Sequence, residues 1–230
     1  MIDIHSHVLP FIDDGSPDME SSLALLREAE LQGVKDLFLT PHYYPARGYF
    51  STRSENQEVY ANLKKACSEA GIGITMHLGN EIYYSIETIR DLREKIVAPM
   101  GNSKMVLLEF SMNKEEEDIT EAIHNIRAIG YQPIIAHPER YPYLDKSHDF
   151  EVIRKMGGLI QLNAASIVGK YGGAIQKTAF SLLKLGWIDF IASDIHSFRK
   201  NQIREAYELV ARKIDPETAE RVFNNRTILA

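Results

Sequence analysis

Short hydrophobic runs alternate with segments of helical periodicity from one end of the 230-residue chain to the other. Seven of these runs have the length and the content of branched apolar residues that are typical of buried strands. They are Ile2 to His5, Asp36 to Thr40, Gly73 to Leu78, Lys104 to Phe110, Gln132 to Ala136, Gly158 to Leu162 and Asp189 to Ala192. Strands that alternate with helices in this way predict an α/β fold in which helices connect the strands of a parallel sheet.

The segments between the strands carry the usual signals of helix ends. Ser16-Pro17 has the residue types of an N-cap and a first helical residue, and Ser54-Glu55-Asn56-Gln57 matches a capping box. Glycines stand where several helices are expected to stop, at Gly33, Gly71, Gly130 and Gly186. The helices therefore have recognisable boundaries in the sequence.

Two helical segments close the chain, from about Phe198 to Lys213 and from Pro216 to Asn224. Asp215-Pro216 is a clear start signal for the second of them. No linker rich in Pro, Gly or Ser and no low-complexity tract divides the sequence. We therefore expect residues 1–230 to form a single domain.

Composition narrows the classes of protein that fit. A net charge of −6 argues against broad attraction to nucleic acid or anionic lipid. No apolar run approaches the roughly 20 residues of a membrane-spanning helix. A single cysteine excludes an intramolecular disulfide and fits a reducing cytoplasm, which is the location we expect. That residue, Cys67, lies in an apolar helical pattern, so we interpret it as packed rather than catalytic.

Nearly every predicted strand is followed by a histidine or a carboxylate. These residues are His5, His7, Asp14, His42, Glu81, Glu109, His137, Asp194 and His196. The carboxyl ends of parallel strands meet on one side of such a fold, so the nine side chains are expected to lie together. Burying that many ionisable groups is costly unless cations neutralise them. The pattern therefore predicts a shared metal centre.

The ligand types limit the metal and the chemistry. Imidazole and carboxylate without thiolate suit Mn²⁺, Zn²⁺, Fe²⁺ or Co²⁺. Nine ligands exceed the need of one ion, and three ions fit better than two if Glu81 bridges two of them. The charge of three divalent ions would exceed that of the four carboxylates and attract a phosphate dianion. Clustered ions also generate hydroxide near neutral pH, so metal-assisted phosphoester hydrolysis is expected.

Several other residues have a functional and an ordinary interpretation. Arg140 is expected to hold phosphate oxygens, with a structural ion pair as the alternative. The loop from Tyr43 to Arg53 is rich in aromatic residues and is a candidate recognition surface for a phenol. The acidic run Glu115 to Asp118 is interpreted as a helix start. The remaining histidines, His77, His124 and His148, do not follow strands in register, and we expect them to serve packing or to lie on the surface.

The same residues resemble the motifs of the polymerase and histidinol phosphatase (PHP) superfamily. The resemblance rests on His5-Ser6-His7, Thr40-Pro41-His42, Gly79-Asn80-Glu81, Leu108-Glu109-Phe110, Ala136-His137-Pro138-Glu139-Arg140 and Ser193-Asp194-Ile195-His196. Within the superfamily, the segments from Asp3 to His7, from Ile12 to Ser16 and from Ile135 to Tyr141 are similar to the CpsB/CapC branch of bacterial protein-tyrosine phosphatases. The resemblance extends over essentially the whole chain.

The resemblance implies a distorted (β/α)7 barrel with a trinuclear, manganese-preferring centre at the carboxyl ends of its strands. The family pattern assigns His5, His7, Glu81 and Asp194 to one ion, Glu81, Glu109 and His137 to a second, and Asp14, His42 and His196 to a third. It implies hydrolysis of phosphotyrosine, typically on the tyrosine-rich tail of a bacterial tyrosine kinase that controls capsule or exopolysaccharide synthesis. The branch also has a second arginine after the last histidine. Arg199 stands closer to His196 than is usual there, so it serves either the phosphate or the following helix.

Three alternatives remain at this stage. A small-molecule phosphatase that acts on a substrate such as histidinol phosphate would use the same scaffold. A nuclease is disfavoured because the chain has no basic stripe for a nucleic-acid backbone. A non-catalytic metal-binding regulatory protein usually has a broken ligand set, whereas none of the nine positions here is apolar. A thiol phosphatase does not fit, because the Cys-x5-Arg spacing would require arginine where Gly73 stands.

Overall fold

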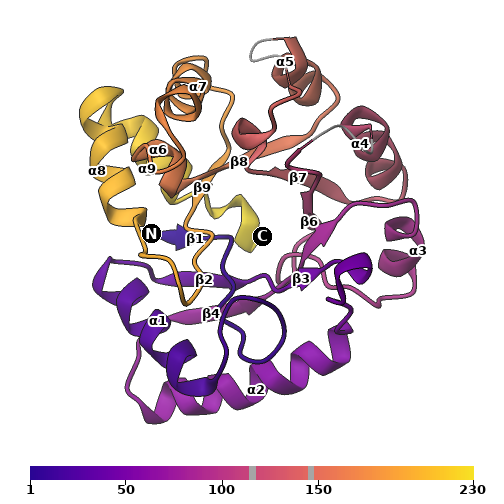
Figure 1. Ribbon diagram of the computed structural model, residues 1–230, viewed down its shortest axis with the longest axis vertical. Coiled ribbons are helices and arrows are strands. Elements are labelled where there is room, and N and C mark those ends of the chain that lie inside the picture. Colours follow the sequence, from indigo (N-terminus) through magenta and orange to yellow (C-terminus); the bar gives the residue numbers. More distant parts are fainter. Residues whose placement is uncertain (114–117, 145–147) are drawn as a thin grey trace.

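Short parallel strands surround the centre of the molecule and helices cover the outside, as Figure 1 shows. The computed structural model describes residues 1–113, 118–144 and 148–230. The strands are β1 (Ile2–Asp3), β2 (Asp36–Leu39), β3 (His42–Tyr43), β4 (Thr75–Leu78), β5 (Glu81–Tyr83), β6 (Met105–Glu109), β7 (Gln132–Ala136), β8 (Leu159–Asn163) and β9 (Phe190–Ala192). All of their pairings are parallel, which confirms the α/β class predicted from the alternating pattern.

In the described residues, nine strands stand in place of the seven expected, because two of the predicted runs are followed by a break and a second short strand. β2 continues into β3 across Thr40-Pro41, and β4 continues into β5 across Gly79-Asn80. A backbone hydrogen bond still connects the two segments at the breaks, from the Gly79 amide to the Leu39 carbonyl at 2.9 Å. Pro41 has no N–H to donate, so it interrupts the regular ladder at this point.

The breaks divide the strands into two sheets, ordered β1-β2-β4 and β3-β5-β6-β7-β8-β9. An isolated parallel bridge between Ser6 and Ile195 brings the start of the chain against the segment after β9. The amide of His7 donates to the carbonyl of Ile195 at 2.9 Å in this bridge. Within the described residues the strands therefore surround an interior without forming one continuous closed barrel.

The interior of this strand arrangement is a small hydrophobic cluster, distinct from the larger core between strands and helices. Alternate positions of β6 and β9 point inward, so Leu107 and Phe190 lie in the interior whereas Leu108 and Ile191 face the helices. The C-terminal turn η3 (Arg226–Leu229) ends near the centre in Figure 1 and places Ile228 in the same interior cluster. The cluster includes first residues of strands, such as Ile2 and Phe190, and last residues, such as Ala136 and Ala192, so it fills the interior along the strands.

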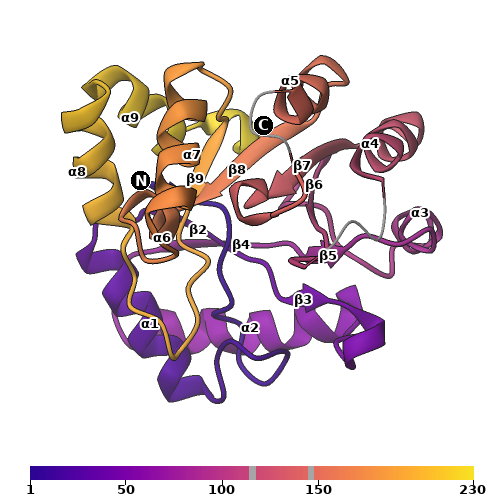
Figure 2. The ribbon, with the colours of Figure 1, turned by 45° about the horizontal axis from the view of Figure 1, so that its top comes forward.

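The helices surround the strands, and the turned view of Figure 2 shows α1 and α2 on the side away from α5 and α7. Their bounds are α1 (Met19–Leu31), α2 (Arg53–Glu69), α3 (Thr88–Arg93), α4 (Ile119–Ala128), α5 (His148–Lys155), α6 (Ala164–Ile167), α7 (Gly173–Lys184), α8 (Ile203–Lys213) and α9 (Pro216–Phe223), with short 3-10 turns at η1 (Pro45–Arg47) and η2 (Pro138–Arg140). Among the described residues, no helix has both the length and the apolar character needed to cross a bilayer.

Two of the predicted helix starts are wrong by about two residues. α1 begins after Asp18, whose carboxylate accepts the Ser21 amide at 2.7 Å, and not at Ser16-Pro17. α2 has its capping box at Thr52 and Glu55, where the Glu55 carboxylate accepts the Thr52 amide at 2.7 Å. Two capping patterns overlap in this stretch, and the one with the charged Glu55 is formed rather than the one predicted from Ser54.

The helix stops and the second C-terminal helix are as predicted. Gly33, Gly71, Gly130 and Gly186 all have positive φ angles, between 67° and 88°, and each lies just beyond the last turn of a helix. Asp215 caps α9 by accepting the Thr218 amide at 2.6 Å. α8, however, begins at Ile203 rather than near Phe198, because residues 198–202 form the loop that leaves the polar end of the strands.

The predicted acidic helix start is described only in part. Asp118 is the N-cap of α4, and its Oδ1 atom accepts the amides of Thr120 at 2.7 Å and Glu121 at 3.2 Å. Glu115, Glu116 and Glu117 lie outside the described residues. The N-cap fits a helix that begins directly after the acidic run.

Candidate metal centre

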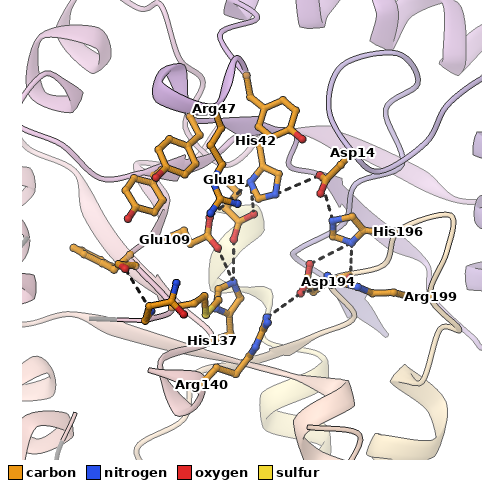
Figure 3. Close-up of a pocket in the computed structure, with 17 residues that line it drawn as sticks. Asp14, His42, Arg47, Glu81, Glu109, His137, Arg140, Asp194, His196 and Arg199 are labelled. Atoms are coloured by element: carbon orange, nitrogen blue, oxygen red, sulfur yellow. Dashed lines mark hydrogen bonds and ion pairs between the residues drawn. The ribbon is translucent and has the colours of Figure 1, made fainter. Parts of the chain in front are cut away.

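The nine side chains expected to bind metal converge at the carboxyl end of the strands, and seven of them line one pocket, which Figure 3 shows. His5 and His7 are adjacent there, with their Nε2 atoms 3.1 Å apart. Both nitrogens lie 3.2 Å from Glu81 Oε2, and they lie 3.7 and 3.5 Å from Asp194 Oδ1. His5, His7 and Glu81 thus form one candidate group of ligands, and Asp194 adjoins both histidines; the family pattern assigns these four residues to one ion.

A second group of ligand atoms shares Glu81. Its Oε1 atom lies 3.1 Å from His137 Nε2, and its Oε2 atom lies 3.0 Å from His42 Nδ1. Glu109 completes the group, 3.9 Å from His137 and 3.8 Å from His42. Glu81 Oε2 therefore faces His5, His7 and His42, whereas Oε1 faces His137, so the carboxylate lies between the first and the second group.

The third group lies nearer the surface. Asp14 Oδ1 is 3.6 Å from His42 Nε2 and 3.7 Å from His196 Nε2. The His196 ring stacks on the His7 ring with 4.1 Å between centroids, so this group adjoins the first one. Asp14 remains about half exposed, whereas His196 is buried, which places the group at the rim of the centre.

The backbone aims these side chains in two different ways. His42 and Glu81 open the short strands β3 and β5, and Glu109 closes β6. His137 and Asp194 instead follow β7 and β9 in the left-handed region, with φ angles of 36° and 51°. A residue with a side chain costs about 1–2 kcal/mol in that region, and such strain is concentrated at functional sites.

His5 and His7 reach the centre by a route that differs from the prediction. The first strand was predicted from Ile2 to His5, but β1 ends at Asp3 and both histidines lie in the segment after it. The amide of Asp194 donates to the carbonyl of His5 at 2.9 Å, and this bond fixes the segment against the residues that follow β9. The convergence therefore comes from this bridge rather than from strand alternation.

Three buried polar residues that the sequence did not mark as functional hold the candidate ligands. Asp13 accepts from His7 Nδ1 at 2.7 Å and from the His42 amide at 2.9 Å. Gln161 Oε1 lies 3.1 Å from His5 Nδ1. Gln161 and Asn163 both belong to β8, the strand for which no ligand was predicted. Carboxylates and amides of this kind orient metal-binding histidines in many sites.

A second chain of hydrogen bonds supports Asp194. Asn163 donates from its amide side chain to Asp194 Oδ2 at 2.7 Å. The backbone amide of Asn163 in turn donates to the buried Glu139 carboxylate at 3.0 Å, and the Ser166 hydroxyl donates to the same oxygen. Asp194 is thus held from β8 and η2 as well as by its own strained backbone.

The electrostatics of the cluster fit a group of cations. Burial, together with the neighbouring Glu81 carboxylate, raises the pKa of Glu109 to about 8. Burial lowers the pKa of His137 to about 4, so its imidazole is neutral near pH 7 and able to bind a metal. Five imidazoles and four carboxylates without a thiolate match the preferences of first-row divalent ions. Added positive charge would allow the clustered carboxylates to ionise together, so the donor set fits a metal centre.

The centre forms the floor of a cavity of about 270 Å³, which we call the metal pocket. Three arginines line it, namely Arg47, Arg140 and Arg199 (Figure 3). Arg140 Nη1 lies 3.6 Å from Asp194 Oδ2, and Arg199 Nη1 lies 2.9 Å from the same oxygen. Arg199, whose role was open, therefore lies at the pocket together with Arg140. Guanidinium groups at these places can bind phosphate oxygens in pairs.

The aromatic loop contributes only part of its residues to the metal pocket. Tyr44, Arg47 and Tyr49 line it, and the Tyr49 ring stacks on the His42 ring with 5.6 Å between centroids. Tyr43 is buried instead and donates its hydroxyl to Asp91 at 3.1 Å. Arg47 was predicted only as part of this candidate recognition loop and not singled out, because the sequence of a loop does not show which way each side chain points.

The residues interpreted as structural lie outside the metal pocket. His77 stacks on Phe38 and pairs with Asp36 at 3.0 Å, near the opposite end of β2. His124 and His148 are exposed on α4 and α5. Cys67 is buried in α2 within the outer core, and burial raises the pKa of its thiol. None of these four contributes to the groups of candidate ligands in the described part of the chain.

Comparison with known proteins agrees with this geometry. The family model for capsular polysaccharide synthesis, CpsB/CapC, matches residues 1–229. The tyrosine-protein phosphatase CpsB of Streptococcus pneumoniae is 31% identical to the chain, over 100% of this chain and 98% of that protein. The tyrosine-protein phosphatase YwqE of Bacillus subtilis is 27% identical, over 99% of this chain and 93% of that protein.

A solved structure gives the same relationship at the level of the fold. It comes from the crystal structures of YwqE from Bacillus subtilis and CpsB from Streptococcus pneumoniae, which are described as metal-dependent tyrosine phosphatases. It superposes with a TM-score of 0.89 at 27% identity and covers 95% of this chain and 90% of that one. Fold, candidate ligands and sequence agree along the whole length, and the chain belongs to the CpsB/CapC family.

Proposed function

We propose that this chain is a manganese-dependent protein-tyrosine phosphatase. The observation that carries the proposal is the convergence of five histidines and four carboxylates at the floor of a pocket whose walls hold three arginines. Membership of a family that includes the tyrosine-protein phosphatases CpsB and YwqE supports the substrate class. The nine candidate ligands are His5, His7, Asp14, His42, Glu81, Glu109, His137, Asp194 and His196.

The chain's own groups have separate tasks in this reaction. The histidines and carboxylates would hold the cations, and Glu81, which contacts His5 and His7 on one side and His137 on the other, would belong to two of the ligand groups. Arg140 and Arg199 bind the phosphoryl oxygens, exchanging part of their contact with Asp194 for the substrate. When bound, divalent cations lower the pKa of water and neutralise the phosphate, which is the chemistry that phosphomonoester hydrolysis needs.

The aromatic wall of the metal pocket suits a phenyl ring. Tyr44 and Tyr49 line it, with the Tyr44 ring 5.3 Å from the Arg47 guanidinium and the Tyr49 ring stacked on His42. A phosphotyrosine whose phosphate lies on the floor of the pocket passes its ring along this wall, where offset or edge contacts between aromatic rings are favourable. Buried Cys67 takes no part in the proposed reaction.

The finer parts of the proposal concern the metal, the partner and the location. Manganese is proposed over Fe²⁺, Co²⁺ or Zn²⁺ because the resemblance to the PHP superfamily favours it. The partner is proposed to be a phosphotyrosine-containing protein, with the tail of a bacterial tyrosine kinase in capsule or exopolysaccharide synthesis as the first candidate. A cytoplasmic location follows from that partner and from the single cysteine.

A comparison of two substrates tests this function against its nearest alternative, a small-molecule phosphatase. We expect the Mn²⁺-loaded protein to hydrolyse a phosphotyrosyl peptide with a kcat/KM at least about tenfold above that for histidinol phosphate. Cys67→Ser is expected to retain full activity, and Glu109→Ala is expected to lose activity on both substrates. Faster turnover of histidinol phosphate would support a small-molecule phosphatase instead. Loss of activity in Cys67→Ser alone would contradict the mechanism.

A further inference from the structure

A second cavity, of about 530 Å³, adjoins the metal pocket. Five aromatic residues line it, namely Tyr43, Tyr44, Phe50, Tyr83 and Tyr84, and we call it the aromatic pocket. Pro45 and Ala46 of η1 complete its wall on the loop side. Its volume is in the range of pockets that accept organic groups, and its lining is mostly apolar.

The two pockets share a wall. Tyr44 and Tyr83 line both of them, and their rings stack with 3.7 Å between centroids and 2° between planes. The Arg47 guanidinium lies 5.3 Å from the centre of the Tyr44 ring. Arg47, which lines the metal pocket, therefore also contacts the ring pair that separates the two pockets. A ligand that leaves the metal pocket across the ring pair therefore enters the aromatic pocket directly.

The polar groups of the aromatic pocket do not make it an anion site. Arg90 is paired with Asp91 at 2.8 Å, and Asp91 also accepts the Tyr43 hydroxyl at 3.1 Å. Glu87 is exposed at the margin and adds negative charge, which disfavours an acidic group. Phe50, by contrast, is 66% exposed although it is a large apolar residue. The charge and the lining both favour an uncharged apolar occupant.

We propose that the aromatic pocket binds a large apolar side chain of the substrate, within two residues of the phosphotyrosine. This proposal rests on the phosphatase function proposed above. Residues of an extended peptide advance about 3.3 Å each, and every second side chain points the same way, so a neighbour of the phosphotyrosine reaches across the Tyr44–Tyr83 wall. The metal pocket then binds the phosphate, and the aromatic pocket selects the sequence around it.

Three substrates separate these two roles. The Mn²⁺-loaded protein is assayed with para-nitrophenyl phosphate, with a phosphotyrosyl peptide carrying Leu at the two positions on each side, and with the same peptide carrying Ser there. We expect kcat/KM for the Leu peptide to exceed that for the Ser peptide by about tenfold, since burial of one large apolar side chain gives an effect of this size.

Two variants test the pocket by opposite changes. Phe50→Ala removes part of the wall, and Ala46→Trp fills the space; neither residue lines the metal pocket. Both are expected to lower the preference for the Leu peptide at least about threefold while leaving turnover of para-nitrophenyl phosphate unchanged. Leu31→Ala, an exposed apolar residue on α1, is the control that should change nothing.

Equal kcat/KM for the Leu and Ser peptides in the unmodified protein would overturn the proposal. A preference that survives in both Phe50→Ala and Ala46→Trp would overturn it as well. If the proposed phosphatase function is wrong, neither peptide is hydrolysed, which distinguishes that outcome from failure of the pocket proposal. In that case the aromatic pocket is tested by calorimetric titration with the same peptides, carrying a non-hydrolysable phosphonate in place of the phosphate. The pocket proposal then requires weaker binding of the Leu peptide by Phe50→Ala and fails if the affinities are equal.

Discussion

Asp13 determines the orientation of two candidate ligands at once. Its Oδ2 atom accepts from His7 Nδ1 at 2.7 Å and from the backbone amide of His42 at 2.9 Å, and its Oδ1 atom accepts the Gly15 amide. Burial would raise its pKa, but the charge and hydrogen bond of His7 outweigh this and keep the pKa below its ordinary value. Asp13 is therefore a charged partner that leaves His7 Nε2 free to face the metal centre.

Asp13→Asn is expected to weaken Mn²⁺ binding by about tenfold to a hundredfold, because an amide cannot replace the carboxylate behind His7. Isothermal titration of the metal-depleted protein with Mn²⁺ measures this loss. Asp36→Asn is the matched control, since Asp36 forms a similar pair with His77 at 3.0 Å outside the centre. Unchanged affinity in Asp13→Asn, or an equal loss in both variants, would contradict the positioning role.

Glu139 should make the stability of the metal-free protein depend on pH. Burial raises the pKa of this carboxyl from its ordinary 4.5 to about 7. Between these values the unfolded chain loses a proton that the folded chain keeps, so the free energy of unfolding falls as pH rises. Above about pH 7 both states are ionised and the loss is complete.

Glu139→Gln stays neutral at every pH and should remove this slope. Between pH 4.5 and 7, the free energy of unfolding of the unmodified protein is expected to fall by roughly 3 kcal/mol relative to that of Glu139→Gln. Urea denaturation of both metal-free proteins at several pH values measures it. Parallel pH profiles would show that the carboxyl titrates normally.

At the scale of secondary structure, the breaks in two strands place His42 and Glu81 at the candidate metal centre. A regular β2 would carry its ladder past Pro41, and a regular β4 would continue past Gly79-Asn80. Instead β3 and β5 pair separately, with His42 opposite Glu81 in register. Both candidate ligands thus stand side by side at the start of new strands, where their side chains face the same pocket.

The C-terminal turn η3 is the element that closes the interior at the other end. Ile228 is fully buried there among residues such as Ile2, Phe38 and Phe190. Ile228→Ala should lower the free energy of unfolding by about 2–4 kcal/mol, which corresponds to a fall in Tm of about 5–15 °C. Thermal denaturation followed by circular dichroism measures the change.

The effect of Ile228→Ala should be confined to stability. Activity at low temperature is expected to stay within about twofold of that of the unmodified protein, because Ile228 does not line the metal pocket and Asn225, just before the turn, donates to the Asp189 carbonyl ahead of the start of β9. Leu229→Ala, a change at a partly buried neighbour, should cost less. If the two variants have the same Tm, η3 does not close the interior in the way described.

For the molecule as a whole, the features predictable from sequence were those with a strong local signal. The seven strand runs, the glycine stops of the helices and the nine histidines and carboxylates all stand out because their residue types are unusual at those places. The parallel α/β fold followed from them. The interpretation of residues 1–230 as one domain stays a prediction, which a single cooperative unfolding transition would support.

The remaining features depend on tertiary structure and have no clear local signal. Gln161 and Asn163 look like ordinary strand residues until β8 is placed beside His5 and Asp194. Asp13 stands next to the candidate ligand Asp14 and has no signal of its own in the sequence. The side-chain direction of Arg47 depends on the residues that pack against its loop. The break between β2 and β3 likewise follows from Pro41, which has no N–H to donate to a neighbouring strand. The sequence alone does not show that β4 is that neighbour.

Removal and return of metal tests the central claim most directly. We expect chelator-treated protein to lose its hydrolysis of a phosphotyrosyl peptide. Added Mn²⁺ should restore the activity as about three ions bind per chain. Mass spectrometry of the metal content counts the bound ions. Glu81→Ala, which removes the residue shared by two ligand groups, should bind fewer ions and stay inactive. Full activity of metal-free protein, or no recovery with Mn²⁺, Zn²⁺ or Fe²⁺, would contradict the account.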